Sequence, residues 1–191
     1  MTIENAPTRT LGGVELPAAG EWKLDPGHAE VGFVGRHFML TKVRGRFRGV
    51  DATIVIGEVP AESSVTAVID ITSLETGDQA RDEHLKSADF FEAEKYPQAV
   101  FSSTSVSWEG TGGTAVGDLT IKDVTHPVTL NIDYLGYARD PWENDRIVFS
   151  ARGKLNREDW GLTWNMLLES GGLLVSKEIE LVLELEAVRQ A

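Results

Sequence analysis

The sequence predicts an all-β protein: an antiparallel, up-and-down, eight-stranded barrel, with one or two short helices at about residues 78–95 covering one end. Three observations predict this class. Apolar and polar residues alternate with a period of two along most of the chain, short turn signals separate these runs, and one charged segment breaks the pattern. Closure into a barrel removes exposed strand edges. A two-sheet sandwich is the alternative that periodicity alone leaves open.

The chain is predicted to divide into a flexible leader, residues 1–19, and one barrel domain, residues 20–191. The leader combines Pro7, Gly12, Gly13 and Pro17 with little periodicity. A chain of 191 residues is long enough for one domain with a sizeable core. Cysteine is absent, so no disulfide framework holds the fold.

The early strands show one change of parity. Their apolar face includes Phe33 and Phe47, and it continues at Ala52 and Ile54 on the opposite parity. This change without a turn predicts a bulge at about residues 48–51. The polar face of the same stretch is basic, which indicates either a solvated surface or a patch for a ligand phosphate or an acidic partner. Its four residues are Lys42, Arg44, Arg46 and Arg48.

The last strand has the cleanest alternation, between residues 178 and 186. Its apolar residues are Ile179, Leu181, Leu183 and Leu185. Its acidic residues are Glu178, Glu180, Glu184 and Glu186. This pattern is typical of an antiparallel strand between a core and water.

The charged segment, residues 76–101, lacks the two-residue period. Asp78 can cap a short helix that runs through Leu85, because its carboxylate accepts a first-turn N–H. Ser87 or Asp89 can start a second turn that carries Phe90 and Phe91, and Pro97 ends it. We expect this segment to cover one mouth of the barrel.

The barrel interior is the first candidate binding site, because an eight-stranded barrel either packs solid or holds one small ligand. Small residues on the inward faces favour a cavity over a packed core. These small residues are Gly35, Gly45, Ser103, Ser105, Ala151 and Gly153. The predicted lining residues are Phe33, Phe47, Phe101, Leu119, Ile121, Phe149, Trp160, Trp164, Leu181 and Leu183. For Trp160 and Trp164, the alternative is a plug at one barrel end.

Polar residues predicted at the rim form the second candidate site: His37, Arg81, Asp82 and His84. One interpretation is structural, with these groups tying the helix to the barrel by charge-assisted hydrogen bonds. The other is an acid–base set of His84, Asp82 and Arg81. No histidine pair has metal-binding spacing, no nucleophile elbow or phosphate loop occurs, and we predict no metal, no catalytic residue and no cofactor.

The formal net charge of −12 excludes nucleic acid as an expected partner, because such a surface repels phosphate backbones. No apolar run approaches the length that crosses a membrane. The first ten residues lack a basic region and an apolar region of a signal peptide, which predicts a cytoplasmic location. Trp142 follows a proline in an acidic loop, where we expect it to be exposed or part of an interface.

Several motifs in one order, spanning about residues 20–188, resemble the YceI-like family. Residues 76–101 read T-G-x-x-x-R-D-x-H-L-x-S-x-D-F-F-x-x-x-x-Y-P-x-x-x-F. Residues 117–128 are similar to the family's G-x-L-T-I-x-x-V-T-x-P-V strand pair, and residues 157–161 to its R-x-D-[FW]-G stretch. Similar opening strands are residues 22–28, 31–37 and 43–47.

The resemblance implies a lipocalin-like barrel that binds, transports or stores a polyisoprenoid or similar long-chain amphiphile without catalysis. The resemblance also implies a homodimer. Many relatives are exported, whereas the N-terminal sequence of this chain predicts a cytoplasmic location. Two other functions stay open. One is an enzyme that uses His84, Asp82 and Arg81 on an isoprenoid or quinone-like substrate, and the other is a stress-related protein with an incidental cavity.

Overall fold

The computed structural model describes residues 6–169 and 171–191 of the chain. Its one α-helix in these ranges is α1 (Gln79–Lys86), and the remaining regular structure is β-strand and short 3₁₀ turns. The strands are β1 (Thr8–Leu11), β2 (Val14–Pro17), β3 (Gly20–Leu24), β4 (Glu30–His37), β5 (Thr41–Phe47), β6 (Val50–Ile56), β7 (Ser64–Asp70), β8 (Leu74–Glu75), β9 (Gln98–Glu109), β10 (Gly112–Ile121), β11 (Val124–Arg139), β12 (Asp145–Asn156) and β13 (Glu178–Arg189).

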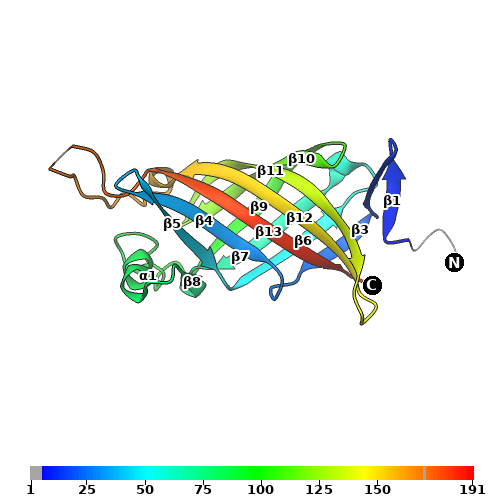
Figure 1. Ribbon diagram of the computed structural model, residues 1–191, viewed down its shortest axis with the longest axis horizontal. Helices are drawn as coiled ribbons and strands as arrows, with labels where there is room; N and C mark the ends of the chain where they lie inside the picture. The colour runs from blue at the N-terminus through cyan, green and yellow to red at the C-terminus, as the bar shows by residue number, and fades with distance from the viewer. Residues whose placement is uncertain (1–5, 170) are drawn as a thin grey trace.

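The main sheet closes on itself as an antiparallel barrel, which confirms the predicted fold class. From β6 the order runs through β7, β9, β10, β11 and β12 to β13. β13 then pairs with β3 near its C-terminal end and with β4 near its start, and β3 pairs with β6. β3 with β4, and β5 with β6, each act as one long interrupted strand, so the barrel has eight strand positions. α1 lies at one end of this barrel, and β1, β2 and the C-terminus lie at the other (Figure 1).

The predicted leader is corrected by the structure from residue 8 onward. Residues 8–17 form the β1–β2 hairpin, and Leu16 is buried against Trp22 and Ile54 of the barrel. Arg9 ties the hairpin to the barrel through hydrogen bonds to the carbonyl groups of Gly57 and Glu58. The turn at Gly12 and Gly13, with φ of +58° and +84°, is what the local composition signals. Burial of Leu16 is a tertiary effect that composition does not reveal.

The predicted change of parity between β5 and β6 is present, but it occurs at a break between two strands and not at a bulge within one ladder. β5 ends at Phe47 and β6 begins at Val50, and residues of both parities line the same interior. A bulge lies in β9, where Gly117 pairs with Ser103 but Val116 pairs with Ser105. Thr104 is therefore the extra residue, and the inward face moves to Val106. The inward position expected for Ser105 is wrong for this reason, since its side chain is exposed.

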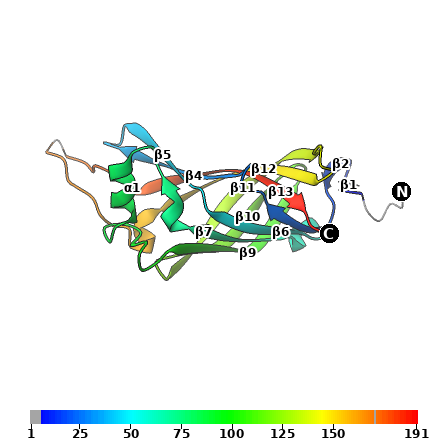
Figure 2. The same cartoon turned by 90° about the horizontal axis from the view of Figure 1, so that it is seen from below.

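The helix prediction is confirmed in its first part. The Asp78 side chain accepts a hydrogen bond from the Arg81 N–H at 2.9 Å, and α1 ends at Lys86. Residues 88–95 form a series of turns instead of a second helix, with Phe90 buried. Figure 2 shows α1 across one end of the barrel.

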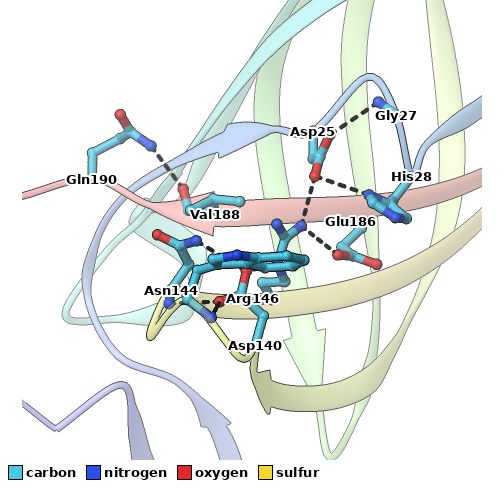
Figure 3. Close-up of polar contacts among 10 residues, drawn as sticks. Asp25, Gly27, His28, Asp140, Asn144, Arg146, Glu186, Val188 and Gln190 are labelled. Atoms are coloured by element: carbon cyan, nitrogen blue, oxygen red, sulfur yellow. Dashed lines mark hydrogen bonds and ion pairs between the residues drawn. The ribbon is translucent and has the colours of Figure 1, made fainter.

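The opposite end of the barrel is stabilised by a cluster of charges around Arg146 of β12 (Figure 3). Its guanidinium contacts Asp25 and Glu186 at 2.6 Å and Asp140 at 2.7 Å. Asp25, His28 and Glu186 have the spacing of metal ligands, but Arg146 binds both of these carboxylates. The cluster is therefore best interpreted as an ion-pair network that joins the β3–β4 turn, the β11–β12 loop and β13.

Arg146→Met is expected to destabilise the protein by roughly 2–3 kcal/mol at pH 7, because three carboxylates lose their shared cation. The hydrogen bond from Arg146, helped by His28, lowers the pKa of Asp25 to about 2. A carboxyl whose pKa is lowered by folding stabilises the native state above its unfolded pKa of about 3.9, and this contribution disappears toward pH 2.

The difference in unfolding free energy between wild type and Arg146→Met should therefore be largest above pH 5 and should shrink toward pH 2. Urea unfolding at several pH values measures this difference. Arg139→Met is the matched control, because Arg139 is exposed and lies 4.0 Å from its only ion-pair partner in the described chain, Glu143. A difference that is independent of pH would contradict this account.

Candidate ligand-binding cavity

The barrel encloses an elongated cavity of about 500 Å³, within the size range of pockets that hold small-molecule ligands. Lining residues come from both ends of the barrel: Arg9, Pro17 and Pro60 near the β1–β2 hairpin, and His84 and Leu174 near α1. Most of the wall between them is aliphatic or aromatic. The arrangement suits an apolar chain that lies along the barrel axis.

All ten residues predicted to lie inside the barrel line this cavity: Phe33, Phe47, Phe101, Leu119, Ile121, Phe149, Trp160, Trp164, Leu181 and Leu183. Some of them also form the buried cluster that holds the wall in place, in which Phe101 and Leu119 are opposite each other in β9 and β10. The structure thus brings together the predicted lining set, and its role in ligand binding stays a prediction.

The small residues have different roles. Gly35 and Ala151 line the cavity, although a Cβ atom at Gly35 would lie only 3.3 Å from Ile179 Cδ1. Gly45 does not, because the Phe33 ring lies directly over it and a Cβ atom at this position would collide with the ring. Gly153 packs closely on the Thr129 carbonyl, and the Ser103 hydroxyl accepts a hydrogen bond from the Val65 N–H at 2.8 Å. Part of the space predicted from these residues is therefore filled by neighbouring strands.

A short 3₁₀ turn after β12, η4 (Arg157–Trp160), directs two large side chains inward. Asn156 caps the turn by accepting the Glu158 N–H at 3.1 Å, and Gly161 ends it with φ of +75°, where a side chain would be strained. Trp160 is buried and donates its indole N–H to the Leu119 carbonyl at 2.9 Å. This local geometry explains why the R-x-D-W-G sequence occurs here.

Arg157 is the other inward side chain of η4, and it lines the cavity. Its Nε donates to the Ser176 carbonyl at 2.9 Å and its Nη1 to the Leu162 carbonyl, while the guanidinium lies 5.7 Å from the centre of the Phe90 ring. Burial lowers the pKa of this guanidinium, although its ordinary value is so high that it stays charged. The sequence pattern predicts no role for Arg157, although the R-x-D-W-G motif contains it.

Three of the four predicted rim residues lie in the cavity wall, and the fourth lies outside it. His37, Arg81 and His84 line the cavity, whereas Asp82 lies outside it, in a shallow groove beside α1. Asp82 accepts hydrogen bonds from the Thr76 N–H at 2.8 Å and from its hydroxyl at 2.5 Å. Arg81 donates to the same residue, from Nε to Oγ1 at 2.8 Å. Asp82 and Arg81 thus anchor the start of α1, as the structural interpretation predicts.

His84 has a different carboxylate partner from the one that the acid–base interpretation requires. Its Nε2 lies 2.8 Å from Asp89 Oδ2, and its ring packs edge-on against Trp164 and Phe90, with centroid distances of 4.5 Å and 5.2 Å. Asp82 instead binds Thr76. The three residues of the hypothetical catalytic set therefore lie close in sequence without forming one hydrogen-bonded group in the structure.

The basic face of β5 is partly neutralised by the neighbouring strand. Arg46 and Arg48 each bind Glu75 of β8, at 2.6 Å and 2.7 Å, and these bonds lower the pKa of the Glu75 carboxyl. Arg46 also lies 3.7 Å from Glu30. These contacts favour a solvated outer surface over a phosphate site.

Comparison with known proteins identifies the family. The model of the YceI-like domain matches residues 22–187. The chain belongs to the YceI-like family. It is 39% identical over 175 residues to the UPF0312 protein plu2095 of Photorhabdus laumondii, and 38% identical to protein YceI of Escherichia coli O157:H7. Both alignments cover 90% of this chain and 88% of the relative.

Solved structures show that the YceI-like barrel is shared. BcnA of Burkholderia cenocepacia matches with a TM-score of 0.74 at 22% identity, over 85% of this chain and 98% of that one. The YceI protein of Campylobacter jejuni matches with a TM-score of 0.70 at 30% identity, over 82% and 90%. A polyisoprenoid binding domain from Saccharophagus degradans has a TM-score of 0.63 at 17% identity, over 91% and 100%.

No helix of this YceI-like chain, in residues 6–169 and 171–191, has the length and hydropathy needed to cross a membrane. α1 contains eight residues, and none of them is buried.

Proposed function

We propose that this YceI-like protein binds a long-chain isoprenoid or similar amphiphile inside the barrel and carries or stores it without catalysis. The observation that supports the proposal is the elongated cavity of about 500 Å³ with its largely aliphatic and aromatic wall. The description of the Saccharophagus degradans domain as polyisoprenoid binding, on the same fold, agrees with it.

The expected affinity follows from burial alone. Ten ligand methylenes transferred from water to this wall contribute roughly 8 kcal/mol before ordering costs. A dissociation constant of 1 μM corresponds to about 8.2 kcal/mol. An apolar tail of moderate length therefore supplies enough free energy for binding at micromolar concentrations.

Affinity is expected to rise with each added prenyl unit until the cavity is full, and then to level off. Isothermal titration of prenyl alcohols with two to eight units, added from a common solvent, measures the series. Each further buried unit adds five carbons, so at the same free energy per carbon it should strengthen binding by roughly 100-fold or more. Affinity that does not change with chain length would contradict burial as the source of binding.

We also propose a homodimer with Trp142 at its interface. The Trp142 side chain is 78% exposed, and the Asp140 carboxylate holds its loop by accepting the Trp142 N–H at 2.9 Å. A large exposed aromatic side chain of this kind is typical of an interface anchor. We expect a dimer by light scattering that persists at high salt and weakens in Trp142→Ala. A monomer mass for wild type in every buffer would contradict this assembly.

A further inference from the structure

The wall of the cavity carries charge of one sign, which bears on the ligand's head group if the proposed function holds. The protein has 30 acidic and 18 basic residues, yet among the described residues the cavity is lined by no Asp or Glu. Four arginines line it: Arg9, Arg36, Arg81 and Arg157. Such a wall disfavours a cationic head and favours an acceptor of hydrogen bonds from guanidinium groups.

Arg157 is the most deeply placed of these cations, with 4% of its surface exposed. Its Nη2 is shielded from water and donates to no group in the described chain. No carboxylate of the described chain lies within 4.0 Å of Arg157, whereas Arg9 lies 3.0 Å from Glu58. Burying a cation without a counter-ion costs free energy. The binding of an anion that neutralises this cation is therefore favoured.

Arg81 is a second cation toward the same end of the cavity, whereas the Arg36 side chain lies on the outer face of the barrel, near Lys154, and only the Arg36 main chain meets the cavity wall. Arg36 of β4 is joined to Arg157 through Ser176, whose N–H donates to the Arg36 carbonyl at 3.0 Å and whose own carbonyl accepts from Arg157. The Arg81 guanidinium donates hydrogen bonds to Thr76, from Nε to the hydroxyl and from Nη2 to the carbonyl group. Arg81 makes no ion pair with any carboxylate in residues 6–169 and 171–191. The α1 end of the cavity is therefore cationic, while the rest of the wall is mostly apolar.

We propose that the ligand is a long-chain carboxylic acid whose carboxylate binds Arg157 at the α1 end of the cavity, with the tail extending along the barrel. A carboxylate oxygen accepts a charge-assisted hydrogen bond from Nη2, the one guanidinium nitrogen of Arg157 that has no partner in the described chain. The other two nitrogen atoms of Arg157 are already held by carbonyl groups, so the orientation of the guanidinium is fixed before binding. Nη2 is shielded from water, which favours a small, flat head over a bulky tetrahedral one.

A matched set of geranylgeranyl ligands tests the preference for the head group in wild-type protein. The four ligands are geranylgeranoic acid, geranylgeraniol, geranylgeranylamine and geranylgeranyl monophosphate. We expect the carboxylic acid to bind at least about tenfold more tightly than the alcohol and the monophosphate, and the amine to bind most weakly. Equal affinity for all four would overturn this inference and leave the proposed function intact. Failure of all four to bind would contradict the proposed function itself.

Variants of Arg157 test whether this residue is the source of the preference for a carboxylate head group. In Arg157→Met the ratio of acid to alcohol affinity should fall to within about twofold, while the alcohol still binds. Arg152→Met is the matched control, because Arg152 is an exposed residue of β12, the strand just before η4, and does not line the cavity. The ratio of acid to alcohol affinity in this variant should equal that of wild type. A folded Arg157→Met protein that keeps the tenfold preference would overturn the assignment.

A crystal structure of wild type with geranylgeranoic acid decides the matter even if Arg157→Met does not fold. The proposal requires a carboxylate oxygen within hydrogen-bonding distance of Arg157 Nη2. A carboxylate bound near Arg9, or one that lies outside the barrel, would overturn it.

Discussion

Phe101→Asp is expected to lower the unfolding free energy by about 4 kcal/mol or more at pH 7. Phe101 is buried, lines the cavity from β9, and its ring fills the space beside Gly117, where a Cβ atom would collide with it. The substitution removes a large apolar side chain and places a carboxyl group in an apolar interior. Chemical denaturation measures the change, and the same variant should lose the bound amphiphile.

The pH dependence of this variant separates a buried carboxyl from an exposed one. Burial raises the pKa of a carboxyl in the folded state, so the folded protein binds the proton more tightly than the unfolded chain. The deficit relative to wild type should therefore grow as the pH rises from 4 to 7. Val100→Asp is the control, because Val100 is 42% exposed on the same strand, and it should change stability by less than about 1 kcal/mol. If Phe101→Asp unfolds like wild type, the assignment of the inward face is wrong.

Ala151→Phe is expected to weaken ligand binding strongly while leaving the fold intact. Ala151 lies on β12, opposite Ile132 on one side and Leu183 on the other, and it faces the cavity. A phenyl group there enters space that the ligand needs. If it displaces about three ligand methylenes, the loss is roughly 2.4 kcal/mol, or about 50-fold in affinity.

The control for this variant is Arg152→Phe, which adds the same ring on the outer face of the adjacent position. Titration with geranylgeraniol compares both variants with wild type, and thermal unfolding confirms that each is folded. A folded Ala151→Phe protein with wild-type affinity would show that the amphiphile binds outside the barrel.

Much of this architecture could be predicted because the barrel strands carry a strong two-residue period. β13 shows this most clearly, with four apolar residues facing the cavity and its acidic residues on the other face. The helix start at Asp78 and the break between Phe47 and Val50 were also predictable, since each depends on a few neighbouring residues. Signals of this local kind can be recognised in a single sequence.

The features that were missed depend on contacts between distant segments. The β1–β2 hairpin looked flexible because its own sequence lacks periodicity. Packing of Leu16 on Trp22 and the hydrogen bonds from Arg9 to the carbonyls of residues 57 and 58 order it. Thr104 becomes a bulge through its register with β10, which no local pattern specifies. Arg157 was overlooked because an arginine in a turn is usually exposed, and its burial depends on Ser176 and Leu162.

Native mass spectrometry of the purified protein, combined with organic extraction, tests the central claim most directly. The account predicts that wild type carries an amphiphile of defined mass, and that extraction releases the same mass. Arg152→Phe should retain this species, and Ala151→Phe should carry far less of it. A wild-type protein that has only the mass of its polypeptide, yields no extractable amphiphile and takes up no added geranylgeranyl ligand would contradict the account.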